Sequence, residues 1–279
     1  MREFMYDLSS VLIAGILFAS MALLIELGYR VGRRYQRTSD EPSKTQIITI
    51  QGSLIGILAL LLGFTFSLSL QRFDSRSEAV VNEANAIGTA YLRAQLLPAS
   101  VREPTLKALA SYLNLRVRAG TLSLDHAYQR QAMLDQASQQ QALLWRYALQ
   151  AAGEAPNPVT SGLFLEALNE MIDAYGTRDA TLNRHVPEIV LSLLYTTFLM
   201  AGVILGYSAG VAGHRASFAT YIMVGLIVLL VFLIIDLDRP RRGLIQVSHK
   251  SLVDLENAMA QPRPVAPFHE FMPGSSAPR

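Results

Sequence analysis

The stretch IITIQGSLIGILALLLGFTFSLSL, residues 47–70, decides the fold, because it is apolar over 24 positions and contains no charged residue. A helix of this length spans about 36 Å, which exceeds a hydrocarbon core of about 30 Å. Three further apolar runs cover residues 8–27, 189–212 and 218–235, and Glu26 is the one charged residue within them. Barrel strands have about ten alternating residues, so runs of this length indicate helices. The sequence therefore predicts an all-α membrane protein with four transmembrane helices.

The apolar runs also predict how the chain is divided. The predicted segments are a first membrane helix pair (1–70, with spans of about 8–27 and 47–70), a helical extramembrane domain (71–186), a second membrane helix pair (187–236, with spans of about 189–212 and 218–235) and a C-terminal tail (237–279). We expect the extramembrane domain to be a membrane-proximal bundle inserted between the second and third spans. The tail combines a short amphipathic helix near residues 245–259 with a Pro-rich end from Gln261, which we expect to be disordered.

The extramembrane domain is predicted to be helical because its apolar residues recur at steps of three and four. This spacing extends the second span into the aqueous phase as one helix that ends at Pro98. A second helix is predicted to end just before Gly120, since glycine is common just past a helix C-terminus. A third is predicted to begin near Ser123, and no stretch of the domain alternates as a strand would.

Composition excludes several classes of function. The chain has no cysteine, which removes disulfides, zinc-thiolate sites, iron–sulfur clusters and a thiol nucleophile. Its net charge of +2 is too small to indicate nucleic-acid binding. The five histidines are scattered without metal-ligand spacing, and no phosphate loop, dinucleotide fingerprint or nucleophile elbow is present. We therefore expect no enzyme, no cofactor and no bound metal.

The second half of the 47–70 span carries the main candidate site. Leu60, Phe64 and Leu68 recur one helical turn apart, and in an oligomer they would form apolar rings around a central pore. The same spacing is typical of residues that face lipid or pack against another helix. Arg72 and Arg76 follow at the membrane exit, where they would either attract anions into a vestibule or anchor the helix among headgroups.

A second candidate site lies after the last span. Asp236 and Asp238 precede Arg239, Arg241 and Arg242. Two carboxylates are too few for a typical Ca²⁺ site, which needs six or more oxygen ligands. Ion pairs at the helix end, formed by Asp236, Asp238, Arg239 and Arg241, are the prediction.

Three stretches together resemble a bacterial bestrophin-like family. They are LGFTFSLSLQRFDSR (62–76), EANAIGTAYLRAQLLP (83–98) and DLDRPRRG (236–243). The resemblance covers most of the chain from the second span to Met259. A weaker similarity to bestrophins themselves rests on the four-span arrangement and on Leu62, Gly63, Phe64, Leu68 and Arg72.

The resemblance implies a pentameric anion channel whose second span lines the pore, with a neck of three apolar rings. Phe64 matches the innermost ring, Leu60 is apolar but not aromatic, and Gly56 stands where a large apolar residue is expected. The acidic Ca²⁺ clasp of animal bestrophins has no match.

We therefore expect a homo-oligomeric anion channel, or a channel-like protein, in a bacterial inner membrane, with lipid and anions as its further partners. The alternative is a non-conducting membrane scaffold or sensor whose helical domain binds a protein. Gly56 and the lack of polar rings in the spans favour this alternative. Basic residues flank the membrane on both sides, and their number favours a cytoplasmic location for the middle domain and both termini.

Overall fold

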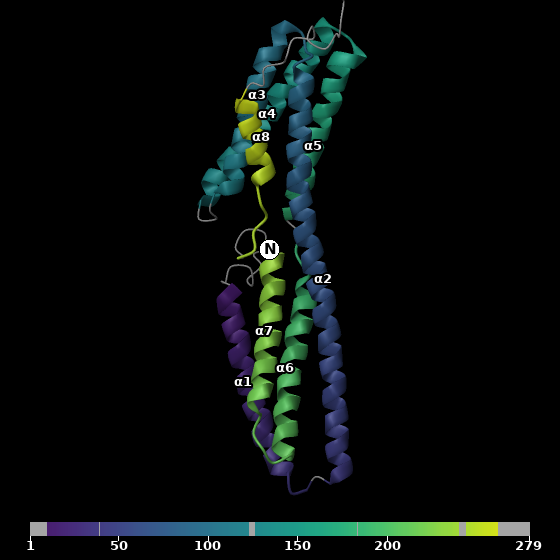
Figure 1. Cartoon of the computed structure of the whole chain (residues 1–279), viewed down its shortest axis with the longest axis vertical. Helices are drawn as coiled ribbons and strands as arrows, with labels where there is room; N and C mark the ends of the chain where they lie inside the picture. Colours follow the sequence, from purple (N-terminus) through teal and green to yellow (C-terminus); the bar gives the residue numbers. More distant parts are fainter. Residues whose placement is uncertain (1–9, 39, 123–125, 183, 240–243, 262–279) are drawn as a thin grey trace, which may run out of the picture. The chain divides into compact units, whose positions relative to one another are not determined.

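The computed structural model describes residues 10–38, 40–122, 126–182, 184–239 and 244–261, and these residues form helices and turns without a strand. The elements are α1 (Ser10–Tyr35), α2 (Glu41–Ala94), α3 (Ala99–Thr121), α4 (Ala127–Glu154), the π-helical turn η3 (Pro158–Gly162), α5 (Leu163–Leu182), α6 (Glu188–Val211), α7 (Phe218–Asp238) and α8 (Lys250–Ala260) (Figure 1). This architecture confirms the all-α prediction.

Four helices in the described ranges are long and apolar enough to cross a membrane, namely α1, α2, α6 and α7. Each coincides with one of the predicted apolar runs, except that residues 8 and 9 of the first run lie outside the described part of the chain and that α6 ends at Val211, one residue before the end of its run. The helices extend beyond the apolar residues at several ends. The limits of the membrane spans therefore stay predictions.

The long second helix agrees with the sequence, with a shorter end. α2 runs without a break from Glu41 to Ala94, four residues before Pro98, which instead precedes α3. The prediction that Gly120 ends a helix was wrong, because α3 continues to Thr121. Gly120 lies inside the helix, and an added Cβ would come within 3.2 Å of the His249 ring.

Two other predicted boundaries fall partly on residues that are not described. The helix expected from Ser123 begins at Ala127, and residues 123–125 lie outside the described ranges. The short tail helix is α8, and the Pro-rich end beyond Gln261 also lies outside them.

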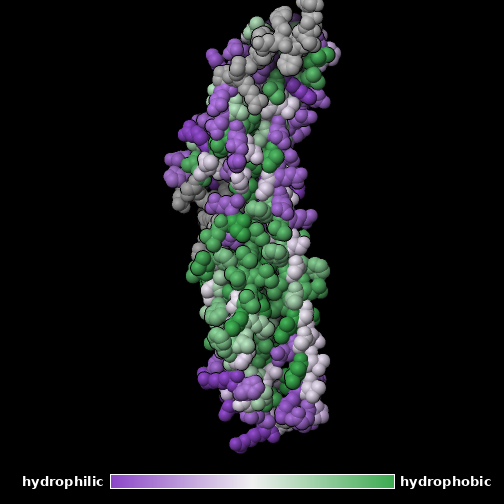
Figure 2. All heavy atoms as spheres, viewed as in Figure 1, coloured by the Kyte–Doolittle hydropathy of each residue, from purple (hydrophilic) through white to green (hydrophobic). Residues whose placement is uncertain are grey.

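The chain divides into two compact units, which are described separately. The membrane unit comprises Met1–Ala79 and Gly176–Ser248, and the polar unit comprises Val80–Tyr175 and His249–Arg279. Helices α2 and α5 contribute residues to both. Figure 2 shows apolar side chains over the visible face of the membrane unit, with hydrophilic residues at the end that carries the α1–α2 and α6–α7 connections.

Helices α1 and α6 of the membrane unit pack through glycines spaced four residues apart. At Gly206 of α6, a Cβ would overlap the main-chain oxygen of Ile25 on α1. The glycines whose Cβ would meet main chain of the other helix are Gly28, Gly32, Gly206 and Gly210. Lipid gives little hydrophobic drive for helix association, so this close backbone approach supplies the van der Waals packing instead.

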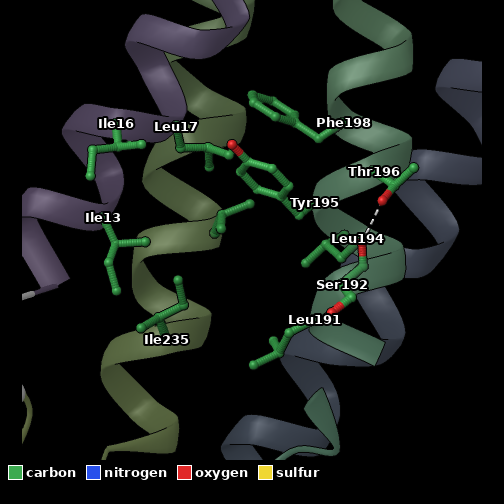
Figure 3. Close-up of a pocket in the computed structure, with 11 residues that line it drawn as sticks. Ile13, Ile16, Leu17, Leu191, Ser192, Leu194, Tyr195, Thr196, Phe198 and Ile235 are labelled. Atoms are coloured by element: carbon green, nitrogen blue, oxygen red, sulfur yellow. Dashed lines mark hydrogen bonds between the residues drawn. The ribbon is translucent and has the colours of Figure 1, made fainter. Parts of the chain in front are cut away.

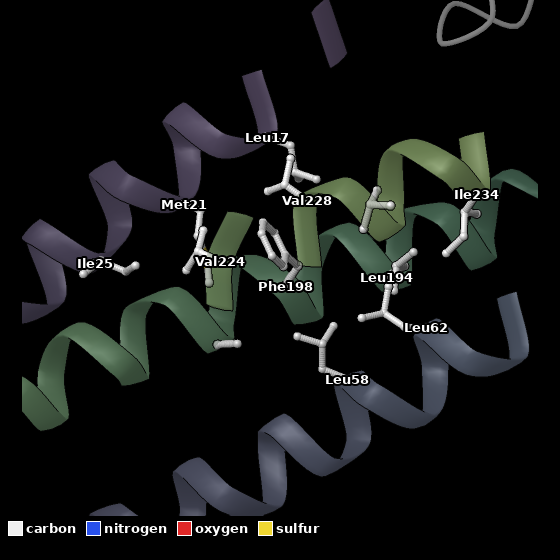
Figure 4. Close-up of a cluster of buried hydrophobic side chains, with 12 residues drawn as sticks. Leu17, Met21, Ile25, Leu58, Leu62, Leu194, Phe198, Val224, Val228 and Ile234 are labelled. Carbon is white, nitrogen blue, oxygen red and sulfur yellow. The ribbon is translucent and has the colours of Figure 1, made fainter. Parts of the chain in front are cut away.

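A buried apolar cluster joins the four long helices. Phe198 of α6 lies at its centre without exposed surface, and α2 contributes Leu58 and Leu62 (Figure 4). The other members come from α1, α6 and α7, namely Leu17, Met21, Ile25, Leu194, Ala201, Val224, Val228, Val231 and Ile234. α2 thus joins the membrane unit through one side.

The polar unit is built around a buried ion pair. Arg116 of α3 donates from Nε to Glu83 Oε1 of α2 at 2.6 Å, and its guanidinium lies 4.5 Å from the Tyr175 ring centre. Burial disfavours the charged form of Arg116, but the Glu83 carboxylate outweighs it and raises the pKa of Arg116. Burial also raises the pKa of Tyr112, whose hydroxyl accepts from Gln141 at 3.2 Å.

Helix α8 packs within the polar unit. Leu255 lies 3.3 Å from the position of a Cβ at Gly88. Asn114 of α3 donates to Glu256 of α8 at 2.8 Å. One apolar and one polar contact therefore fix the amphipathic helix predicted near residues 245–259.

Candidate functional site

Helix α2 presents two different faces within the membrane unit. The residues of its buried face follow steps of four and three, and they are Leu58, Leu62, Thr65, Ser69 and Arg76. A repeat of about 3.5 residues keeps one stripe of a helix against its neighbours. This stripe holds α2 in the membrane unit and leaves the opposite side of the helix uncovered.

The opposite side carries the predicted neck residues, and we call Leu60, Phe64 and Leu68 the exposed face of α2. Their exposed fractions are 59%, 61% and 40%. They follow one another at single helical turns, so the three side chains form a line along the helix. The structure thus brings them together on a surface of the protomer rather than in its core.

The line of large side chains stops at Leu60. Gly56 precedes it by one turn and is also exposed, and a Cβ at Gly56 would meet no atom within 4 Å. In a single protomer, nothing fills the space beside this glycine.

Arg76 lies inside the membrane unit, with 1% of its surface exposed. Its guanidinium donates to three carbonyl oxygens, those of Thr181 at 3.3 Å, Leu237 at 3.1 Å and Arg184 at 2.7 Å. Asp238 lies 3.9 Å from Nη2. One arginine therefore ties α2 to the end of α5, to the connection after it and to the end of α7.

The two aspartates at the end of α7 act as hydrogen-bond acceptors in this cluster. Both carboxylate oxygens of Asp238 accept from the Val186 amide at 3.1 Å, and His185 Nδ1 lies 3.8 Å from Oδ2. Asp236 accepts from the Ile245 amide at 2.9 Å, while its Oδ1 is buried without a hydrogen-bond partner. The described hydrogen bonds of the two aspartates thus run to the α5–α6 connection and to the segment after α7.

The arginines of the predicted helix-end ion pairs are placed only in part. Arg239 is buried with 3% of its surface exposed, and Arg241 lies outside the described residues. The pairing of these arginines with the two aspartates stays a prediction.

Arg72 has a different environment from Arg76, although it lies one turn away on α2. Its Nε is buried and has no hydrogen-bond partner. Arg72 borders a pocket of about 280 Å³ whose other lining residues are Leu68, Gln71, Ser75, Thr181 and Arg184. Among the described residues that line this pocket, two are cationic and none is acidic.

A larger cavity of about 320 Å³ lies among α1, α6 and α7 (Figure 3). Ile13, Ile16, Leu194 and Ile235 are among its mainly apolar lining. Thr196 also borders it, and its hydroxyl donates to the Ser192 carbonyl of its own helix at 2.9 Å. The described residues that line the cavity include no charged side chain, so the contacts that they offer are mainly apolar.

Sequence reasoning missed Thr181 and Arg184, and it missed the partners of Arg76. In the sequence, Arg184 is one basic residue among several near the membrane, and nothing distinguishes it from the others. The glycine spacing on α1 and α6 was also missed, although Gly28-x-x-x-Gly32 and Gly202-x-x-x-Gly206-x-x-x-Gly210 are visible in the sequence. Across the described ranges, no group of three or more metal-ligating side chains is clustered.

A profile of the Bestrophin-like domain matches residues 16–252. The fold is similar to crystal structures of variants of a bacterial bestrophin homologue from Klebsiella pneumoniae. One has a TM-score of 0.65 at 16% identity and covers 88% of this chain and 96% of that one. Another has a TM-score of 0.62 at 15% identity and covers 90% and 98%. No curated protein matches the chain. The match over most of the chain shows that this membrane protein belongs to the bestrophin-like family.

Proposed function

We propose that the protein is an anion channel formed by several copies of the chain, with α2 lining a central pore. The observation that carries this proposal is the division of α2 into a buried stripe and the exposed face of Leu60, Phe64 and Leu68. Family membership supports it, because the resemblance to bestrophins implies an oligomeric channel, with five copies in the known cases.

In this arrangement each copy contributes Phe64 to one apolar ring and Leu60 to another. Narrow apolar rings gate pores by excluding water. Gly56 leaves out a third ring, so we expect a shorter neck. Arg72 is the proposed source of positive potential at the pore mouth, because its Nε has no hydrogen-bond partner. For Arg76 we favour a structural role, since its guanidinium is bound to three carbonyls inside the unit.

The polar helices form, in this proposal, a membrane-proximal domain on the cytoplasmic side of a bacterial inner membrane. Reporter fusions at Gly153 and Thr38 test this orientation. We expect cytoplasmic activity at Gly153 and periplasmic activity at Thr38, because basic residues favour the cytoplasmic side. The reverse pattern would place the domain outside the cytoplasm.

Chloride flux from liposomes tests conduction. Wild-type protein should release chloride, and Phe64→Ala should increase the rate because a wider ring admits water more readily. Phe218→Ala is the matched control, since Phe218 is an exposed phenylalanine of α7, with 81% of its surface accessible. It should leave flux unchanged if that surface faces lipid.

The scaffold alternative predicts a different result. If folded, oligomeric protein passes no ions either as wild type or as Phe64→Ala, the channel proposal fails. Gly56 favours this alternative, because it departs from the three apolar rings that the resemblance to bestrophin channels implies.

A further inference from the structure

We propose that the pocket lined by Arg72 and Arg184 is a binding site for a phosphate group. This inference does not depend on whether the protein conducts ions. It concerns a ligand that would bind a single protomer, at a place on the membrane unit just beyond the apolar run that ends at Leu70.

The two arginines are available for a ligand. Neither Arg72 nor Arg184 has a side-chain hydrogen bond or an ion pair within the described ranges. Arg72 Nε is buried without a partner, which leaves a desolvated donor. A buried donor without an acceptor costs about 1–3 kcal/mol, and a bound anion would remove this cost.

The two guanidinium groups come from different elements, and Arg76 fixes their relative position. It donates from α2 to the carbonyls of Thr181 and Arg184, which belong to the opposite wall of the pocket. These bonds also cover carbonyl oxygens near the C-terminus of α5, which would otherwise repel an anion. Arg76 is therefore a positioning residue for the pocket and does not line it.

The donors in the pocket match an oxyanion. The hydroxyls of Ser75 and Thr181 already donate to backbone carbonyls, at 2.8 Å to Gln71 and 2.8 Å to Arg178. The two guanidinium forks and the Gln71 amide therefore supply the remaining donors. Arginine forks bind phosphate and carboxylate oxygens in pairs, and donors from two separate forks suit the several oxygens of a phosphate group.

Two ligands carry a phosphate group that fits this pocket, namely an anionic lipid headgroup and a free phosphate ion. Leu68 borders the pocket and has 40% of its surface exposed, so an acyl chain would continue along apolar surface from a bound headgroup. The phosphate layer of a bilayer also lies at the end of an apolar span. A soluble phosphate ion needs only the arginines. If the lipid is the source, Leu68 faces lipid, and the proposed pore is lined by the rings of Leu60 and Phe64 alone.

Thermal unfolding in maltoside detergent separates the two sources, because the detergent contains no phosphate. Inorganic phosphate is titrated at constant ionic strength against chloride. In a second series, phosphatidic acid in mixed micelles is titrated against diacylglycerol, which has the same acyl chains and no phosphate. We expect a saturable rise in the unfolding temperature with at least one of the two phosphate probes.

Variants assign the binding to the pocket. Arg72→Gln and Arg184→Gln should each weaken it about tenfold or more, as expected when one charge-assisted hydrogen bond is lost. Ser75→Asp adds a carboxylate to the pocket and should abolish binding by repelling the anion. This variant replaces either glutamine variant that does not fold. Arg34→Gln removes an exposed arginine of α1 and should bind as the wild type does.

The outcomes decide the proposal. Binding of either probe that is lost in the pocket variants and kept by Arg34→Gln supports it. No saturable effect of either probe overturns it, as does binding that all the variants retain equally. Because chloride flux is measured separately, a loss of phosphate binding and a failure of conduction are distinguishable.

Discussion

Replacing Arg76 with alanine is expected to destabilise the membrane unit strongly. The substitution removes donors to the carbonyls of Thr181, Leu237 and Arg184 and leaves Asp238 buried beside the empty site. Water does not replace the lost guanidinium as a partner of Asp238, because the Asp238 side chain is only 2% exposed. The expected effect is therefore larger than that of an ordinary arginine on the surface.

The magnitude follows from these contacts. A hydrogen bond to a charged group contributes about 1.5–3 kcal/mol, but the desolvation of a buried arginine offsets part of the sum of three. Breaking a buried pair by removing one partner costs about 3–5 kcal/mol. At about 2–4 °C per kcal/mol for a domain of 150–250 residues, the unfolding temperature should fall by about 6–20 °C.

Thermal unfolding of purified protein in phosphate-free detergent measures this shift. Arg72→Ala is the matched control, because it removes the same side chain one turn earlier and breaks no hydrogen bond within the described structure. Its effect should stay below about 1 kcal/mol. Adding Asp238→Asn to Arg76→Ala should recover part of the loss, since position 238 then carries no buried negative charge beside the missing guanidinium.

A shift of less than about 2 °C for Arg76→Ala would refute this reasoning, because it is smaller than the loss of even 1 kcal/mol predicts. The guanidinium would then be solvated in the protein, and a vestibule role for Arg76 would regain support.

Three further predictions concern the packing and the polar unit. Gly206→Ala should destabilise the protein by about 1–3 kcal/mol, because the added methyl group overpacks the contact between α1 and α6. Gly225→Ala has open space around its Cβ and should not destabilise it, and thermal unfolding compares the two variants. Arg116→Leu should lower the free energy of unfolding by about 3–5 kcal/mol, because it leaves the Glu83 carboxylate buried without Arg116. The decrease should be smaller when Glu83→Gln is also present, and a double-mutant cycle measured by denaturant unfolding tests this coupling. Burial raises the pKa of Tyr112, so the stability it contributes is complete below the unfolded-state pKa of about 10 and declines as pH rises above it. Tyr112→Phe should flatten this alkaline decline in unfolding scans from about pH 9 to 11, and an unchanged slope would contradict the assignment.

The regular part of the fold was predictable because it depends on local pattern. Unbroken apolar runs specify long helices, and the four spans follow from them directly. The step of four between Leu60, Phe64 and Leu68 also predicts that they share one face of a helix; in the structure all three are exposed on α2, and their role as a neck stays a prediction. Gly120 misled the prediction, because glycine near a helix end serves as a cap or, as here, makes room for a neighbouring side chain.

The polar cluster was not predictable because its partners are distant in sequence. Arg76 binds carbonyls 105, 108 and 161 residues away, and no local pattern indicates which backbone atoms a basic residue reaches. The same holds for Arg184, which lines the same pocket as Arg72 because the connection after α5 folds back to α2. The packing of α1 and α6 through glycines was predictable, in contrast to the polar cluster. A four-residue spacing of small residues within an apolar helix is a local pattern that indicates close helix packing.

Accessibility of Phe64 from water tests the channel proposal most directly. The chain has no cysteine, so Phe64→Cys introduces a single thiol. A membrane-impermeant, negatively charged thiol reagent should modify it and reduce chloride flux through liposomes, because in the proposed channel every copy would place this residue at the pore axis. Phe218→Cys should leave flux unchanged after the same treatment. If the reagent fails to modify Phe64→Cys in folded, oligomeric protein, or modifies it without altering flux, the exposed face of α2 does not line a pore.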